Sequence, residues 1–220
     1  MYSKEFWNSL YENHYYDIPW MSVSWQGNVL KMIEQDLPDN AHTLLDYGCG
    51  NGYMGHYFYK KGFNVELADI SSFLVQKLRL NYCLTDMDII QTDTPNALFG
   101  RKYDVIIAWS LFHHIYPKEW NSFLQGFWQL LNDKGRMIIS GWDLADEIIK
   151  NDGKIARYTG RETWYLNPLV EFVSDDFDVL KNDTLEIIVQ PFTTKRVIRY
   201  YVLEKNKWTY KKNQRDVQVY

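Results

Sequence analysis

Short segments rich in aliphatic residues alternate along this chain with segments whose apolar positions have helical spacing. The aliphatic segments lie at residues 44–47, 64–68, 88–92, 103–108 and 135–140, and the helical segments at 53–61, 72–82 and 118–131. Short apolar runs joined by helices are typical of parallel strands with right-handed crossover connections. The pattern therefore predicts an α/β fold built on a mostly parallel sheet.

The two ends of the chain depart from this alternation. Residues 23–37 have helical spacing and stop at Pro38, and residues 3–20 are expected to form a helix and a loop. Residues 177–190 and 195–204 have the character of long strands, and the short turn between them requires an antiparallel hairpin. We therefore expect a Rossmann-like three-layer sandwich, with a mostly parallel seven-stranded sheet and a C-terminal antiparallel hairpin.

A glycine-rich turn follows the first aliphatic segment. Asp46 is followed by Gly48, Gly50 and Gly52, so glycines occupy every second position after a carboxylate. Glycine accepts backbone angles that other residues resist, and it lets a ligand approach the backbone closely. A strand that turns into a helix in this way is typical of a nucleotide-like binding site. Asp46 would repel a phosphate there, but it could pair with a cationic ligand group.

Two further carboxylates end the next two predicted strands. Asp69 ends the second strand, at about the distance from the glycine turn where an acid accepts both ribose hydroxyls. Asp93 ends the third strand. The turn also satisfies a dinucleotide fingerprint through Gly50, Gly52 and Gly55, so a nicotinamide enzyme is the alternative. The C-terminal hairpin argues against that alternative, because a dehydrogenase would continue with parallel strands.

This series of residues resembles the class I S-adenosylmethionine-dependent methyltransferases, over roughly residues 30–205. The resemblance implies S-adenosyl-L-methionine as methyl donor and S-adenosyl-L-homocysteine as product. It implies that one group of residues holds the donor: Asp46, Gly48, Gly50, Gly52, Asp69, Ile70, Asp93, Thr94 and Trp109.

A pair of histidines follows the fourth predicted strand. The segment 111–115 is similar to the Leu-His-His-Leu sequence that is frequent in this family, with Phe112 as an extra residue. The resemblance places this segment where the donor's methyl group points, and a positioned histidine base accelerates attack by an alcohol about 10²–10⁴-fold. Adjacent histidines should point in different directions, so at most one is the base, with His114 ahead of His113. The alternative is that one packs internally and the other caps a helix or faces solvent.

Aromatic and basic residues are candidates for binding the acceptor. Tyr15, Tyr16 and Trp20 lie in an aromatic N-terminal segment of the kind that folds over the acceptor pocket in this family. Their rings could exclude water and attract a sulfonium, although a simple aromatic cover over the core is equally expected. Arg157 and Arg161 suit a carboxylate or phosphate on the acceptor. Surface pairing with neighbouring acids is their alternative role.

Length and composition favour a single methyltransferase domain over residues 1–220. Within it, residues 1–40 are expected to form a helical and aromatic cap over the acceptor site, 41–205 the Rossmann-like core and 206–220 a polar tail. The chain has 220 residues, of which 46% are hydrophobic, enough for a sizeable core.

Charge and patterning exclude several classes of protein. The net charge of −4 argues against a general nucleic-acid binder, and no apolar run is long enough to span a membrane. The first residues lack a signal-peptide pattern, and the two cysteines, Cys49 and Cys83, suit a reduced, cytoplasmic location. We expect no metal ion, because no acidic cluster accompanies the histidine pair. We also expect a monomer or a homodimer.

The sequence therefore predicts an enzyme that methylates a small polar molecule. Oxygen is the first choice of acceptor atom and nitrogen is close behind, with a sugar, a nucleotide-sugar or a phosphorylated amine as possible acceptors. Asn167-Pro168 lies far from the fourth strand, which disfavours methylation of nucleic-acid bases. The alternatives are a protein methyltransferase and a non-catalytic S-adenosylmethionine-binding regulatory module.

Overall fold

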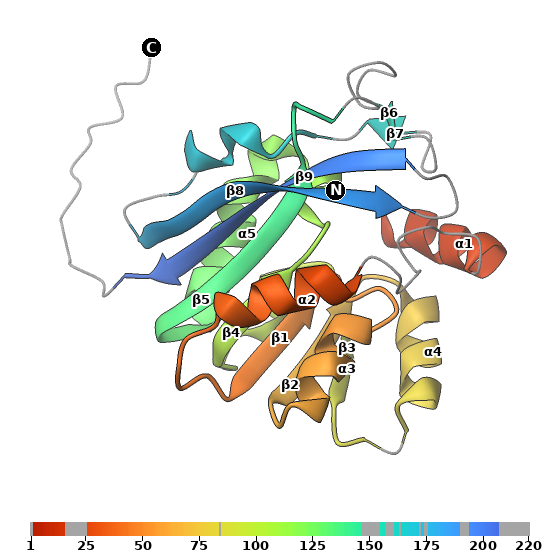
Figure 1. The fold of residues 1–220 in the computed structure, drawn as a ribbon. Coiled ribbons are helices and arrows are strands. Elements are labelled where there is room, and N and C mark those ends of the chain that lie inside the picture. Colours follow the sequence, from red (N-terminus) through yellow and green to blue (C-terminus); the bar gives the residue numbers. More distant parts are fainter. Residues whose placement is uncertain are drawn as a thin grey trace, which may run out of the picture.

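A seven-stranded sheet runs through the molecule in the order β3-β2-β1-β4-β5-β9-β8 (Figure 1). The computed structural model describes residues 2–15, 26–83, 85–146, 155–156, 161–162, 164–171, 173, 176–189 and 194–206. The strands of the sheet are β1 (Thr43–Tyr47), β2 (Asn64–Asp69), β3 (Asp88–Gln91), β4 (Tyr103–Ala108), β5 (Leu131–Trp142), β8 (Phe177–Val189) and β9 (Thr194–Lys205). Neighbours among β1 to β5 pair in parallel, and β9 pairs antiparallel with both β5 and β8. The predicted mostly parallel sheet with a C-terminal hairpin is confirmed.

Helices cover both faces of this sheet, which gives the predicted three layers (Figure 1). The α-helices are α1 (Lys4–His14), α2 (Gln26–Gln35), α3 (Tyr53–Lys60), α4 (Ser72–Asn81) and α5 (Pro117–Leu130). Short 3-10 turns are η2 (Pro95–Leu98), η3 (Phe112–His114) and η4 (Asn167–Glu171). Two short strands, β6 (Ile155–Ala156) and β7 (Arg161–Glu162), pair with each other outside the main sheet.

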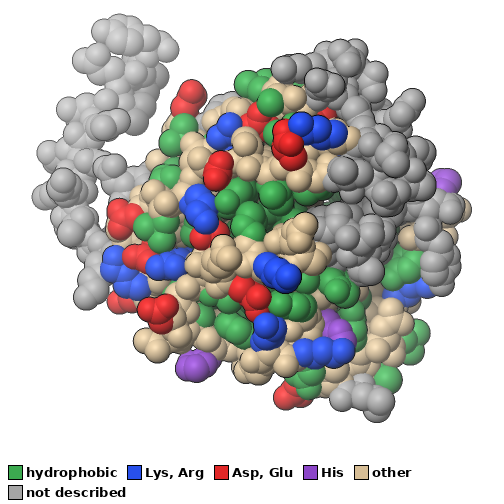
Figure 2. All heavy atoms as spheres, viewed as in Figure 1, with side chains coloured by type: hydrophobic (Ala, Val, Ile, Leu, Met, Phe, Trp, Pro, Cys, Tyr) green, Lys and Arg blue, Asp and Glu red, His purple; other side chains and the backbone are tan. Residues whose placement is uncertain are grey.

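The surface carries mixed charge on the face that Figure 2 shows. Lys and Arg side chains are interspersed there with Asp and Glu, and neither sign forms a continuous field among the described residues. Every helix among the described residues is too short or too polar to cross a membrane.

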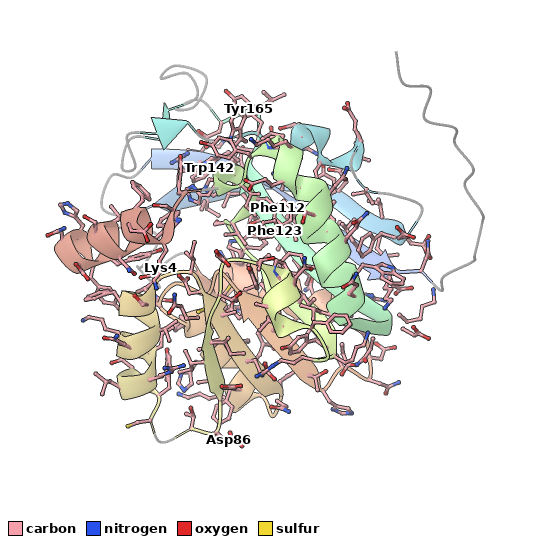
Figure 3. The ribbon with its side chains drawn as sticks, turned by 180° about the vertical axis from the view of Figure 1, so that it is seen from behind. Lys4, Asp86, Phe112, Phe123, Trp142 and Tyr165 are labelled. Atoms are coloured by element: carbon pink, nitrogen blue, oxygen red, sulfur yellow. The ribbon has the colours of Figure 1, made fainter. Side chains whose placement is uncertain are left out.

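Two hydrophobic clusters lie on opposite faces of the sheet. Val105 and Ile107 of β4 belong to the cluster beneath α2, α3 and α4, whereas Ile106 belongs to the cluster beneath α5. Figure 3 shows Phe112 and Phe123 in this second cluster, between α5 and the sheet. Successive strand residues point to opposite faces, so a strand covered on both faces needs apolar residues at every position. The continuous aliphatic runs of the sequence follow from this double coverage.

Strand β5 begins earlier than the sequence predicts. It starts at Leu131, directly after α5, whereas the aliphatic pattern predicts residues 135–140. Its register against β4 shifts between the pairs made by Leu131 and Arg136, and Lys134 has a φ of +63°. The polar residues between these pairs form an irregularity of the β-bulge type inside the strand. A bulge of this kind has the sequence of a turn, which explains the late predicted start.

Two helical glycines should respond in opposite directions to alanine. A Cβ on Gly55 of α3 would lie 2.2 Å from Cδ2 of the fully buried Leu67, whereas a Cβ on Gly27 of α2 meets nothing within 4 Å. We expect Gly55→Ala to lower the free energy of unfolding by about 2 kcal/mol or more, because the core must shift. Gly27→Ala should raise it by about 0.5 kcal/mol. Urea denaturation of both variants measures the difference, and equal effects would contradict the close packing of α3 on β2.

Candidate functional site

The glycine turn joins the end of β1 to the start of α3. Gly48, Gly50 and Gly52 have φ values of +72°, +55° and +70°, which residues other than glycine rarely adopt. The Gly48 amide donates to the carbonyl oxygen of Ala68 on β2 at 2.7 Å. A Cβ on Gly48 would also lie 3.1 Å from Cδ1 of Leu111. The turn is therefore held tightly at the carboxyl end of the parallel strands.

Asp69 connects this turn to the end of β2. Its carboxylate accepts from the Gly50 amide at 3.1 Å and from the Ser71 amide at 2.9 Å. The residue is only 6% exposed, and burial raises the pKa of its carboxyl to about 6 although these amides act in the opposite direction. A largely ionised acid therefore lies at the sheet edge, next to the backbone of the glycine turn.

Asp46 lies deeper than Asp69. Its carboxylate accepts from the Gly55 amide at 2.9 Å, in the first turn of α3, where a negative charge stabilises the helix. Burial, with a smaller contribution from the charge of Asp69, raises the pKa of Asp46 to about 7. The structure thus gives Asp46 a partner inside the protein, and its pairing with a cationic ligand group stays a prediction.

The other predicted donor residues lie along the same edge. Asp93 is exposed just after β3, and the Thr94 hydroxyl accepts from the Asn96 amide at 3.3 Å. Ile70 packs against the aromatic cluster under α1. Trp109 follows β4 and is 6% exposed, and its buried Nε1 has no hydrogen-bond partner among the described residues. The sheet thus brings together the predicted donor residues, while their contacts with a donor stay predictions.

Helix α1 is fastened to this edge by one side chain. The Asn8 side-chain oxygen accepts from the Ser71 hydroxyl at 2.8 Å and from the Phe73 amide at 3.3 Å. Its amide nitrogen donates to the Ser72 hydroxyl at 3.0 Å. Asn8 therefore holds α1 on the first turn of α4, immediately after Asp69. A single asparagine in a helix gives no recognisable signal, so sequence reasoning missed this contact.

The two histidines lie in η3, just after β4. The His113 ring is 4.8 Å from the Trp142 ring and 3.9 Å from the His114 ring, measured between centroids. His114 is half-buried, with its ring 5.0 Å from that of Trp7 and 5.5 Å from that of Tyr2 on the N-terminal segment. The expectation that the two rings point in different directions is wrong, because they lie against each other.

Packing on β5 accounts for this arrangement. A Cβ on Gly141 would come 3.3 Å from the His113 amide and 3.5 Å from its Nδ1, so the bare glycine lets His113 lie against the strand. Burial lowers the pKa of both histidines, that of His114 to about 3. Both rings are therefore neutral near pH 7, and Nδ1 of His114 has no hydrogen-bond partner among the described residues. A neutral imidazole is able to accept a proton.

The segment after β5 closes over the same edge. Asp143 accepts from Nε of Arg199 at 2.5 Å and from the Asn167 side-chain amide at 3.0 Å. The Trp164 amide donates to the His113 carbonyl oxygen at 3.0 Å. These links connect residues far apart in the sequence, and the Trp142 carbonyl oxygen accepts from the Leu166 amide at 2.9 Å, which holds Trp142 beside the histidines. Figure 3 shows Trp142 and Tyr165 at this end of the sheet, opposite Asp86.

The predicted acceptor residues are placed only in part. Tyr16, Trp20 and Arg157 lie outside the described residues, and Arg161 is described only through its backbone in β7. The Tyr15 ring lies 4.3 Å from Nζ of Lys77 on α4, so it packs against that helix. The roles of these residues in binding an acceptor stay predictions. Among the described side chains, no group of three His, Cys, Asp or Glu is placed to hold a metal ion.

The sheet order, the glycine turn and the acids that end β1 and β2 define a Rossmann-like α/β domain. Within this class, the family model described as "Methyltransferase domain" matches residues 20–175. The chain belongs to this family of methyltransferase domains.

Similar proteins include enzymes with different acceptor atoms. The ubiquinone biosynthesis O-methyltransferase of Coxiella burnetii is 30% identical over 95 residues, which cover 39% of this chain and 38% of that protein. The chain thus matches well under half of that relative's length. An Anabaena variabilis SAM-dependent methyltransferase structure has a TM-score of 0.70 at 18% identity, covering 92% of this chain and 95% of that one. The Burkholderia thailandensis 1,6-didemethyltoxoflavin-N1-methyltransferase, solved with its acceptor and S-adenosylhomocysteine, has a TM-score of 0.68 at 17% identity, covering 93% and 87%.

Proposed function

We propose that this protein transfers a methyl group from S-adenosyl-L-methionine to an oxygen, or a nitrogen, of a small polar acceptor. The observation that carries this proposal is the buried Asp69 carboxylate, which is held between the glycine turn and α4 at the edge where the histidine pair lies. A sugar, a nucleotide-sugar or a phosphorylated amine remains our candidate acceptor. One similar protein is named as an O-methyltransferase and another as an N-methyltransferase, so both acceptor atoms stay in the proposal.

The described residues fit an adenosyl donor. Glycines with positive φ leave their backbone open to a ligand. The ends of β2 and β3 offer carboxylates that could accept hydrogen bonds from hydroxyl and amino groups. We assign Asp69 to the ribose hydroxyls and Asp93 to the adenine amino group. When bound, S-adenosylmethionine would supply an electrophilic methyl group on a sulfonium and leave as S-adenosylhomocysteine.

His114 is the proposed general base, with His113 as the second choice. An acceptor hydroxyl becomes strongly acidic as its oxygen gains the methyl group, so its proton must pass to a nearby base. The low pKa of about 3 makes His114 a weak base that is always unprotonated at neutral pH. A weak base suffices here, because the proton is lost from an oxygen that is already acquiring positive charge. For an amine acceptor, the same residues would only orient the nitrogen and exclude water.

Calorimetric titration of the whole protein tests the donor assignment. We expect S-adenosylmethionine and S-adenosylhomocysteine to bind with micromolar dissociation constants and NADH not to bind. Incubation with radiolabelled S-adenosylmethionine and sets of sugars, phosphates and amines would then identify acceptors. Binding of NADH without binding of either sulfur ligand would overturn the proposal in favour of a nicotinamide enzyme.

Donor binding should weaken as the pH falls through the pKa of Asp69. The folded protein holds this pKa at about 6, above its usual value, so the carboxyl is ionised at pH 7.5 and largely protonated at pH 5. Ribose hydroxyls donate best to the ionised form, and the dissociation constant of S-adenosylhomocysteine should rise about tenfold between pH 7.5 and pH 5. Calorimetry at both values measures the change. The asparagine of Asp69→Asn has no carboxyl to titrate, so the weaker binding of S-adenosylhomocysteine to this variant should vary less with pH.

A further inference from the structure

Arg196 is a cation on the proposed acceptor side of the sheet, and the sequence pattern did not single it out. Arg196 lies near the start of β9, beyond the pair that Ile198 makes with Trp142 at the end of β5. It therefore stands past the carboxyl end of the parallel strands, where an acceptor must approach the donor. The arginines that the sequence singled out, Arg157 and Arg161, lie in a different segment.

The guanidinium of Arg196 is held rigidly on two sides. Its Nε donates to Oδ2 of Asp146 at 2.8 Å, and the same oxygen accepts from the Val197 amide at 2.9 Å. Its Cζ lies 3.7 Å from the centre of the Trp142 ring, which is a cation–π stack. Only Nε is used in the contact with Asp146, so the terminal nitrogens keep the fork that suits a carboxylate or phosphate. The side chain is 13% exposed, so it is largely buried but still in contact with solvent.

Aromatic rings connect this cation to the reaction edge. Trp142, which carries the guanidinium, also contacts the His113 ring at 4.8 Å. Trp109 and Tyr200 lie 6.2 Å apart in the same cluster that Trp142 packs against, so all three rings lie on one face of the sheet. The positive charge of Arg196 is close enough to contribute to the lowered pKa of His113, after burial and the charge of His114.

An unused hydrogen-bond donor lies within this group. The indole Nε1 of Trp109 is buried and makes no hydrogen bond with a described residue. Buried polar groups are nearly always paired, so an unpaired N–H group beside the proposed reaction edge indicates that a ligand atom accepts its hydrogen bond. The face thus combines apolar rings, one open N–H and one fixed cation.

We propose that Arg196 is the specificity-determining residue for an acceptor that is planar and carries a carboxylate or phosphate group. The inference rests on the proposed methyl transfer and names the class of its acceptor. The anionic group would bind the terminal nitrogens of Arg196, the planar part would lie along Trp142, and the reacting atom would reach the donor edge, to which Trp109 belongs.

Fragment binding tests this assignment without knowledge of the natural acceptor. Benzoate, phenyl phosphate and the neutral benzamide would be titrated by ligand-observed NMR into the whole protein, with and without saturating S-adenosylhomocysteine. We expect at least one anion to bind ten times more tightly than benzamide, and the stronger of the two identifies the anionic group. Arg196→Gln should remove this preference, and Arg196→Lys should keep part of it because an ammonium retains the charge but not the fork.

Arg199→Gln is the matched control. Arg199 also lies on β9 and pairs with an aspartate, Asp143, but it belongs to the opposite face of the strand. Its replacement should leave the anion preference unchanged. Equal binding of benzamide and the anions, no binding of any fragment, or equal losses in Arg196→Gln and Arg199→Gln would each overturn the inference. Binding of S-adenosylhomocysteine in the same samples shows separately whether the proposed function holds.

Discussion

Replacing Asp69 with alanine is expected to weaken the binding of S-adenosylhomocysteine by about 100-fold or more. The buried carboxylate already accepts from the Gly50 and Ser71 amides, so it is held in place before any ligand arrives. Each hydrogen bond that a ribose hydroxyl makes to a charged group contributes about 1.5–3 kcal/mol, and two are lost together. Isothermal titration calorimetry measures the affinity, and circular dichroism checks that the variant is folded.

Asp88 supplies the matched control for this experiment. It begins β3, at the end of the sheet away from the glycine turn, and pairs with Arg101 at 2.8 Å. Its side chain is 54% exposed, so Asp88→Ala should leave the affinity for S-adenosylhomocysteine within about twofold, since an exposed ion pair contributes little. A folded Asp69→Ala protein that binds S-adenosylhomocysteine as tightly as the wild type would show that Asp69 does not bind the donor.

Replacing His114 with glutamine is expected to lower kcat for an alcohol acceptor by about 100-fold or more. The variant keeps a polar side chain of similar reach but has no nitrogen that can take a proton. Donor affinity should stay unchanged, because the ring contacts Trp7, Tyr2 and His113 instead of the residues assigned to the donor. Single-turnover rates with saturating S-adenosylmethionine separate this loss from any change in acceptor binding.

His42 is the control for the histidine experiment. It is exposed, and it precedes β1 at the opposite end of the sheet from η3. His42→Gln should leave kcat unchanged, whereas His113→Gln should mainly lower stability because it loses the ring contact with Trp142 beside Gly141. Full activity of a folded His114→Gln variant would exclude this residue as the base and favour a nitrogen acceptor that needs only orientation.

The geometry of the proposed donor edge could be predicted because each of its signals lies within a few consecutive residues. Gly48 to Gly52 need glycine for local backbone reasons, and Asp69 follows from the strand that it ends. The same holds for the parallel strands, whose continuous apolar runs reflect coverage on both faces. The exception among the strands is β5, where a bulge at Lys134 has the local sequence of a turn.

The contacts around helix α1, the histidine pair and Arg196 could not be predicted in the same way, because they join distant parts of the chain. Arg196 and Asp146 are 50 residues apart, and Asn8 and Ser71 are 63 apart. Neither pair has a spacing that a single sequence would reveal, and both depend on how the sheet aligns its strands. The contact between the two histidine rings also depends on a neighbour, Gly141, which lies on another strand.

The position of β9 inside the sheet has a consequence for synthesis of the chain. Among the described strands β9 is the last to leave the ribosome, yet it lies between β5 and β8 and pairs with both. Until residues 194–205 emerge, the backbone of β5 keeps an open edge next to the buried Ile138 and Ile139, and such edges promote aggregation. A chain cut before Thr194 would therefore retain every residue assigned to the donor and still fail to accumulate as folded protein.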